Sequence, residues 1–132
     1  PLQMYIVSGA VTDISSGVYA YEPATHELRR IASGDLRADL SAAALGQAAV
    51  AAAAAVLIVS AVYERTTVKY GERGIRYVQM EAGHAAQNIY LQATALGLGT
   101  VAIGAFDDDG VRKVVNMPAG EQPLYLLPVG KR

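Results

Sequence analysis

The longest regular pattern of apolar residues runs through residues 75–96. Apolar side chains recur there in steps of three and four, the period of an amphipathic helix. They are Ile75, Val78, Ala82, Ala85, Ile89, Ala93 and Leu96. A second stripe runs beside the first: Tyr77, Met80, His84, Asn88, Leu91 and Ala95. The pattern predicts one continuous helix, buried on two sides and roughly 33 Å long. Such a helix is either the spine of the fold or a seam between subunits, and small residues at 82–86 would let another backbone come close.

Six short segments have the alternating or β-branched composition of strands. They are residues 2–7, 17–22, 26–31, 56–59, 100–103 and 124–127. The second and third are separated by Pro23-Ala24-Thr25, a spacer that favours a hairpin. The fourth is apolar at every position, which is typical of a central strand covered on both faces.

Further helices are predicted between the strands. Asp35 can cap a helix over residues 36–45 that ends at Gly46, and the alanines of 48–54 favour another helix. Residues 63–70 predict a short helix or an ordered loop. Asp107-Asp108-Asp109 supplies caps for a helix over 111–115, and residues 118–123 predict a loop. This mixed order, neither strict alternation nor all-helical, predicts the α+β fold class.

The composition limits the classes of protein. A chain of 132 residues that is 52% hydrophobic predicts a single domain, residues 1–132, able to bury a core. Eleven basic and 12 acidic side chains give a formal net charge of −1, and without a basic run we expect no nucleic-acid partner. The apolar run 48–62 is shorter than the ~20 residues of a membrane span. We therefore expect no membrane partner.

The absence of cysteine excludes disulfides and fits a reducing, cytoplasmic location. His26 and His84 lie far apart in the sequence, which disfavours a metal site. We expect His84 to be a core histidine, with Asn88 one turn later as its hydrogen-bond partner. Because the chain opens at Pro1 and passes directly into a strand, we also expect it to lack an N-terminal segment.

The glycines after the long helix do not form a dinucleotide-binding motif. Gly97-Leu98-Gly99 ends a helix, whereas the Rossmann pattern begins one after a strand. With Gly104, these glycines leave the backbone N–H groups near Ile103, Gly104 and Ala105 open to a flat ring. A tight turn that needs positive φ is the alternative.

Two pairs of charged or phenolic side chains are candidate sites. Lys131 and Arg132 follow the last predicted strand and could neutralise a phosphate; the alternative is a solvated tail. Lys69 and Tyr70 place an ammonium beside a phenol and could move a proton during catalysis. The alternative for this second pair is a surface position with a packed ring.

Four segments together resemble the FMN-dependent nitroreductase superfamily, and more closely its SagB-type dehydrogenases, which include oxidases of azoline rings in peptide natural products. They are ERTTVKYGERGIRY at 64–77, EAGHAAQN at 81–88, ALGLGTVAIGAF at 95–106 and PVG at 128–130. The resemblance covers essentially the whole chain, although the first third matches mainly in pattern.

The resemblance implies a mostly antiparallel central sheet flanked by helices, in an interwoven homodimer with the long helix at its interface and FMN bound between subunits. By the family pattern, the backbone at Ile103, Gly104 and Ala105 faces the flavin ring. Lys131 and Arg132 would reach its phosphate. Lys69 and Tyr70 would be the catalytic base and proton relay.

One departure from the family pattern leaves two functions open. The family carries an arginine-rich phosphate-binding segment and a Ser/Gly-rich turn before the first strand, and neither is present before Pro1. The first function is an FMN-dependent oxidoreductase with ping-pong turnover; the second is a flavin-free domain or subunit that acts as a dimerisation or binding scaffold. A peptide azoline, a nitroaromatic and a quinone all stay open as substrates, as does the choice between NADH and NADPH.

Overall fold

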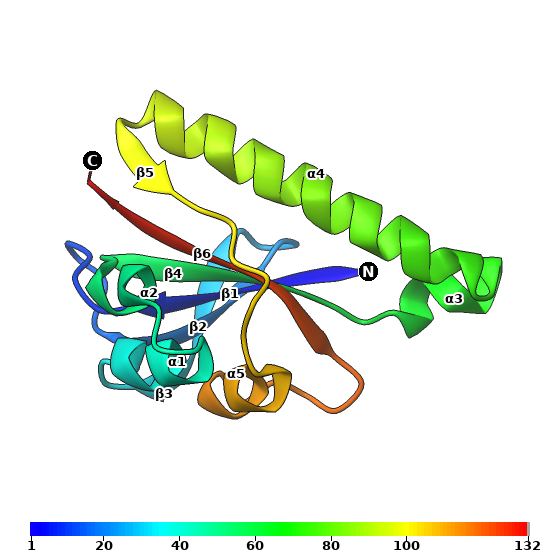
Figure 1. The fold of residues 1–132 in the computed structure, drawn as a ribbon, viewed down its shortest axis with the longest axis horizontal. Coiled ribbons are helices and arrows are strands. Elements are labelled where there is room, and N and C mark those ends of the chain that lie inside the picture. The colour runs from blue at the N-terminus through cyan, green and yellow to red at the C-terminus, as the bar shows by residue number, and fades with distance from the viewer. Residues whose placement is uncertain (132) are drawn as a thin grey trace.

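The protein folds around one antiparallel sheet, as a computed structural model of residues 1–131 shows (Figure 1). The sheet has six strands in the order β3-β2-β1-β4-β6-β5, and every neighbouring pair is antiparallel. The strands are β1 (Leu2–Ser8), β2 (Gly17–Glu22), β3 (Glu27–Ser33), β4 (Ala55–Ala61), β5 (Leu98–Thr100) and β6 (Gln122–Lys131). The helices are α1 (Arg37–Ala43), α2 (Ala48–Ala52), α3 (Glu64–Tyr70), α4 (Arg73–Ala95) and α5 (Asp108–Val114). The predicted α+β class and nitroreductase-like sheet are confirmed.

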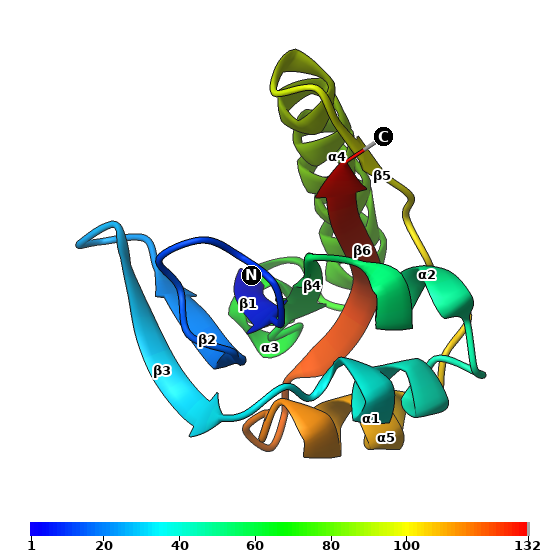
Figure 2. The ribbon, with the colours of Figure 1, turned by 90° about the vertical axis from the view of Figure 1, so that its left-hand side faces the viewer.

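Helices cover both faces of the sheet, and the sequence of β4 explains how. Figure 2 shows α4 on one side of the sheet and α1, α2 and α5 on the other. Alternate residues of a strand point to opposite faces. Val56 and Ile58 of β4 accordingly pack in the cluster with the three short helices, while Val59 packs with Ala82 and Ala86 of α4. The prediction of a central strand covered on both faces is therefore confirmed.

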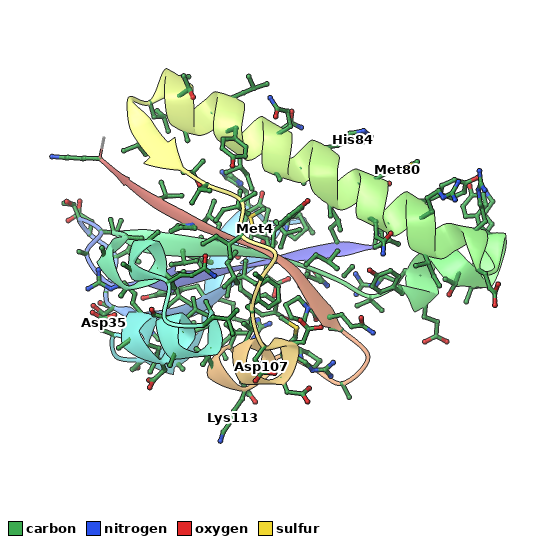
Figure 3. All side chains as sticks on the ribbon, viewed as in Figure 1. Met4, Asp35, Met80, His84, Asp107 and Lys113 are labelled. Carbon is green, nitrogen blue, oxygen red and sulfur yellow. The ribbon has the colours of Figure 1, made fainter. Side chains whose placement is uncertain are left out.

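The long helix is present, and within the single chain it is buried on one side and not on the two sides predicted. Its buried residues form one stripe: Gly74, Val78, Ala82, Ala86 and Ala93. The second predicted stripe is exposed along its whole length, from Tyr77 to Ala95. Met80 and His84 lie on the side of α4 that faces away from the sheet (Figure 3). His84 is therefore not a core histidine, because no other element of the described chain covers this side.

Backbone pairing moves two predicted boundaries. The strand expected at 100–103 is instead Leu98–Thr100, and Ile103 makes only an isolated bridge to Leu126. The last strand is longer than 124–127 and extends to Lys131, which lies opposite Leu98. The backbone of Lys131 thus belongs to the sheet, while its side chain is exposed.

Two predicted helix details also have clear outcomes. Residues 64–70 form a helix, α3, where helix and loop were both open. Asp107 caps α5 as predicted, because its carboxylate accepts a hydrogen bond of 2.9 Å from the N–H of Gly110. Within residues 1–131, no helix is both long and apolar enough to cross a membrane.

Candidate functional site

A hollow lies between α2 and the paired ends of β5 and β6, and we call it the α2–β6 hollow. Its volume is about 280 Å³. Its lining residues are Ala49, Ala52, Ala53, Gly99, Thr100, Val101, Pro128, Val129, Gly130 and Lys131. Most of these side chains are small, so the backbone of β5 and β6 is open to a ligand.

Two polar groups of this hollow have the chemistry to bind a ligand. The hydroxyl of Thr100 is buried and has no hydrogen-bond partner within residues 1–131. A buried polar group without a partner is uncommon in folded proteins and calls for an explanation such as a missing ligand. Lys131 adds an exposed ammonium at the same end of the sheet. Arg132, its predicted companion, lies outside the described residues.

The loop at Ile103, Gly104 and Ala105 continues from this hollow. Ile103 is fixed to Leu126 of β6 through its N–H and its C=O, at 2.8 and 2.9 Å. Gly104 and Ala105 are exposed, and no described residue accepts a hydrogen bond from their N–H groups. These two N–H groups are therefore open, whereas the N–H of Ile103, which the sequence analysis grouped with them, is bonded within the sheet.

Two side chains that the sequence analysis missed hold this loop in place. Gln47 lies in the turn between α1 and α2, and its amide nitrogen donates to the C=O of Ala105 at 2.9 Å. Tyr90 of α4 accepts a hydrogen bond of 2.6 Å from the N–H of Ala102. A glutamine next to Gly46 and a tyrosine in a small-residue helix carry no local sequence signal for these roles. Their partners are 58 and 12 residues away along the chain.

Lys69 and Tyr70 are the last two residues of α3, and both are exposed. The Lys69 ammonium lies 5.2 Å from the centre of the Tyr70 ring. The Tyr70 ring also packs edge to face against Tyr77 of α4, with 5.3 Å between ring centres. Within one chain the pair is therefore a surface feature with a packed ring.

One chain does not bring the two groups of candidate residues together. Lys69 and Tyr70 precede the first residue of α4, whereas β5 and Lys131 follow its last turn (Figure 1). A helix of 23 residues is roughly 35 Å long at ~1.5 Å per residue. A single site that used both groups would have to be built from two chains.

An antiparallel α+β domain with an open hollow at a sheet end, lined by small residues and one cation, is a fold and site suited to a flat anionic cofactor. The profile of the nitroreductase family matches residues 1–131. The chain belongs to the nitroreductase family. Members of this family are oxidoreductases, and they generally depend on FMN.

Two relatives of the chain are longer than the chain itself. A Methanocaldococcus jannaschii protein described as a nitroreductase is 48% identical over 132 residues, 100% of this chain and 66% of that protein. The trifolitoxin operon protein TfxC of Rhizobium leguminosarum bv. trifolii is 27% identical over 115 residues. That match covers 86% of this chain and 32% of TfxC. The chain thus spans less than two thirds of the length of these relatives.

Solved structures agree with the family assignment. A nitroreductase of Anabaena variabilis superposes with a TM-score of 0.93 at 35% identity, over 98% of this chain and 27% of that chain. The NADPH:FMN oxidoreductase of Vibrio harveyi, complexed with NAD+, gives 0.62 at 27% identity over 72% of this chain and 45% of its own. The E. coli microcin synthetase McbBCD complex with truncated pro-MccB17 bound gives 0.86 over 100% of this chain and 52% of its own. At 22% identity this last likeness shows the fold alone.

Proposed function

We propose that the protein is an FMN-dependent oxidoreductase and that FMN binds along the α2–β6 hollow. The observation that carries this proposal is the pair of open N–H groups at Gly104 and Ala105, on the same side of the fold as the Thr100 hydroxyl and Lys131. Ile103 is opposite Leu126, five residues before Lys131 on β6, so at ~3.3 Å per residue the two ends lie about 17 Å apart. That span suits a three-ring system followed by a five-carbon chain and a phosphate.

Each polar group in the hollow or in the loop beside it is proposed to match one part of FMN. The N–H groups of Gly104 and Ala105 would donate to the polar edge of the ring, and Thr100 would bond the ribityl chain. Lys131 would bind the phosphate through a charge-assisted hydrogen bond, the stronger kind of hydrogen bond, and Arg132 is proposed to share this role. Bound FMN would supply a two-electron acceptor, and dioxygen would be the final oxidant, taking up two electrons and two protons to form hydrogen peroxide.

We propose that the working unit is a homodimer. Lys69 and Tyr70 lie a helix length from the hollow of their own chain, and the side of α4 between them exposes Met80 and Leu91 at 53% and 60%. Two copies that packed these exposed sides together in antiparallel orientation would bring the Lys69-Tyr70 pair of each chain toward the hollow of the other. The exposed apolar side of α4 supports this arrangement. So does the distance of Lys69 and Tyr70 from the hollow of their own chain.

Within that dimer, Lys69 and Tyr70 are proposed as the catalytic pair of a SagB-type dehydrogenase. A substrate ring such as a peptide azoline loses one hydrogen as a proton to this pair, and the second hydrogen leaves with two electrons for the cofactor. The pairing of a lysine with a tyrosine in the SagB-type motif favours this branch.

Nitroaromatic and quinone substrates would need an electron donor in place of the azoline. For these we propose NADH or NADPH, since one relative of known structure is named as an NADPH:FMN oxidoreductase. Turnover by either route is ping-pong, because the electron donor leaves before the acceptor binds.

Flavin content and variant kinetics of the complete protein test this proposal. We expect flavin absorbance in the purified protein, weaker FMN retention in Lys131→Ala, and retained FMN with lost turnover in Lys69→Ala and Tyr70→Phe. A colourless protein that FMN does not titrate would overturn the proposal and favour the alternative, a flavin-free dimerisation or binding scaffold. Equal flavin loss in Lys69→Ala and Tyr70→Phe would refute their catalytic assignment.

A further inference from the structure

Two cationic and two aromatic side chains alternate along the chain at the corner between α3 and α4. We call these four side chains the corner cluster. It consists of Lys69, Tyr70, Arg73 and Tyr77. The Tyr70 and Tyr77 rings are perpendicular, at 84°, with 5.3 Å between their centres. Lys69 lies 5.2 Å from the Tyr70 ring, and the Arg73 guanidinium lies 6.0 Å from the Tyr77 ring. Two cations thus flank two rings, and each cation is within cation–π distance of one of them.

The backbone of this corner has little freedom. Gly71 has a φ of +56°, a backbone conformation that residues other than glycine rarely adopt. A Cβ on Gly74 would lie 3.0 Å from the Cα of Thr67 and 3.1 Å from the carbonyl carbon of Thr66. Helix α3 therefore packs directly on the first turn of α4, which fixes the relative position of the two tyrosines.

The core does not explain the position of the Tyr77 ring. Tyr77 is 38% exposed, and the buried stripe of α4 holds the helix on the sheet through Val78 and Ala82. Arg73 and Tyr77 are one turn apart, at i and i+4, the spacing at which helical side chains meet. The contacts of the Tyr77 ring within the corner are thus with Tyr70 on one side and with Arg73 on the other.

We infer that Tyr77, held by Arg73, is a positioning residue that keeps the Tyr70 phenol in one orientation. This inference rests on the proposed catalytic role of Tyr70. An exposed tyrosine without a neighbouring ring samples several side-chain rotamers, and only one of them aims the phenol at a given substrate proton. Edge-to-face packing against Tyr77 favours one rotamer, so the ring of Tyr77 matters and its hydroxyl does not.

Steady-state kinetics of the complete, FMN-loaded protein test this inference, with a synthetic thiazoline peptide as substrate and dioxygen as acceptor. Tyr77→Ala should lower kcat by roughly twofold to tenfold, the change expected from losing the interaction energy of one aromatic pair. KM and FMN content should not change. Tyr77→Phe keeps the ring and should restore kcat. An unchanged kcat in Tyr77→Ala, or a Tyr77→Phe protein as slow as Tyr77→Ala, would overturn the inference.

Arg73→Ala and Arg76→Ala provide a charge-matched comparison. Both remove one exposed cation from the first turns of α4, but within residues 1–131 only Arg73 lies over the Tyr77 ring. We expect a smaller loss of kcat in Arg73→Ala than in Tyr77→Ala and none in Arg76→Ala. Equal losses in the two arginine variants would show a general charge effect and would contradict the role given to Arg73.

The outcomes separate this inference from the proposed function. If Lys69→Ala and Tyr70→Phe turn over normally, the catalytic assignment fails and the positioning role falls with it. If those variants lose turnover while Tyr77→Ala does not, only the positioning role fails. The molar mass of Tyr77→Ala in solution should equal that of the parent protein, and dissociation into single chains would assign Tyr77 to the subunit contact instead.

Discussion

The two faces of the sheet differ in how completely the chain covers them. On one face, which we call the filled face, α1, α2 and α5 contribute Leu40, Val50 and Val111, all 0% exposed. On the other face, which we call the α4 face, the buried cluster contains Val59 and Leu127 from the sheet and the alanines Ala82 and Ala86 from the helix. Alanine side chains bury little apolar area, so the α4 face has the weaker hold on its helix.

Two further observations show that the α4 face is incomplete in one chain. An apolar hollow of about 460 Å³ lies along it, lined by side chains that include Ile6, Val11, Leu57 and Leu98. Ser8 also lines this hollow, and its buried hydroxyl has no partner within the described part of the chain. Helix α4 also exposes Met80 and Leu91 on its outer side, so part of its apolar surface is not buried by its own chain. The filled face thus has its apolar side chains covered within the chain, whereas the α4 face leaves apolar area exposed.

The largest expected effect on stability is the loss of a leucine from the filled face, and a leucine on the outer side of α4 provides the comparison. Leu40→Ala removes a side chain that is 0% exposed and should lower the free energy of unfolding by ~2–5 kcal/mol. Leu91→Ala removes one that is 60% exposed and should cost less than ~0.5 kcal/mol in a single chain. Urea unfolding at several protein concentrations measures both. A loss for Leu91→Ala that grows with protein concentration would assign Leu91 to a subunit contact.

The second effect concerns a buried hydrogen-bond network on the filled face. Glu121 is 3% exposed, and its two carboxylate oxygens accept hydrogen bonds from Tyr5, at 3.1 Å, and from Ser60. Tyr5→Phe leaves one buried oxygen without a donor and should cost ~1–3 kcal/mol. Tyr125→Phe is the matched control near α4, because its hydroxyl has no partner within residues 1–131 and should cost almost nothing.

The same network predicts a pH dependence. Burial, together with the hydrogen bond to Glu121 and the nearby Glu121 charge, raises the pKa of Tyr5. A raised folded-state pKa adds stability below the unfolded value of about 10, and this stability is lost as the pH rises above it. Unfolding free energies should therefore fall between pH 9 and 11, as a rough range, in the parent protein and less in Tyr5→Phe. Equal slopes in the two proteins would contradict this role of Tyr5.

The filled face was easier to predict from the sequence than the α4 face. The runs at 56–59 and 36–45 have local periods that determine both the element and its buried side, because the covering helices belong to the same chain. The two stripes of α4 are equally regular, but which of them is buried depends on what packs against the helix. The sequence pattern alone could not show that His84 faces outward.

Some residues of the candidate site could also be predicted from the sequence, and others could not. The backbone donors at Gly104 and Ala105 could be predicted because glycine spacing is a local signal. Gln47 and Tyr90 could not, because their partners are set by the path of the chain and not by neighbouring residues. The extension of β6 to Lys131 depends on pairing with β5, a contact that no local pattern contains.

A glycine on α4 tests directly whether that face meets another backbone. Apart from the adjacent residues and the nearby backbone of the helix itself, no described atom lies within 4 Å of a Cβ built on Gly83, in the interior of the helix. Gly83→Ala should therefore stabilise a single chain by ~0.5–1 kcal/mol, since glycine is a poor helix former. In a dimer packed closely along this side, the added methyl would instead weaken association. Urea midpoints and solution molar mass, measured together, show which sign applies.

The smallest effect is expected at the edge of the filled face, at the ion pair of Asp35 and Arg37. Hydrogen bonds from the Arg37 side chain, and a further one from its N–H, lower the pKa of Asp35 from 3.8 to about 2, against the opposing effect of burial. A lowered folded-state pKa adds stability above the unfolded value, and this stability is lost as the pH falls from about 4 through the folded-state value of about 2. The Asp35 side chain is 43% exposed, so solvent screening should keep its contribution below ~1 kcal/mol. Asp35→Asn should therefore unfold slightly more easily than the parent protein at pH 7 and equally easily near pH 1, whereas a difference that persists at pH 1 would show that Asp35 acts through its geometry and not its charge.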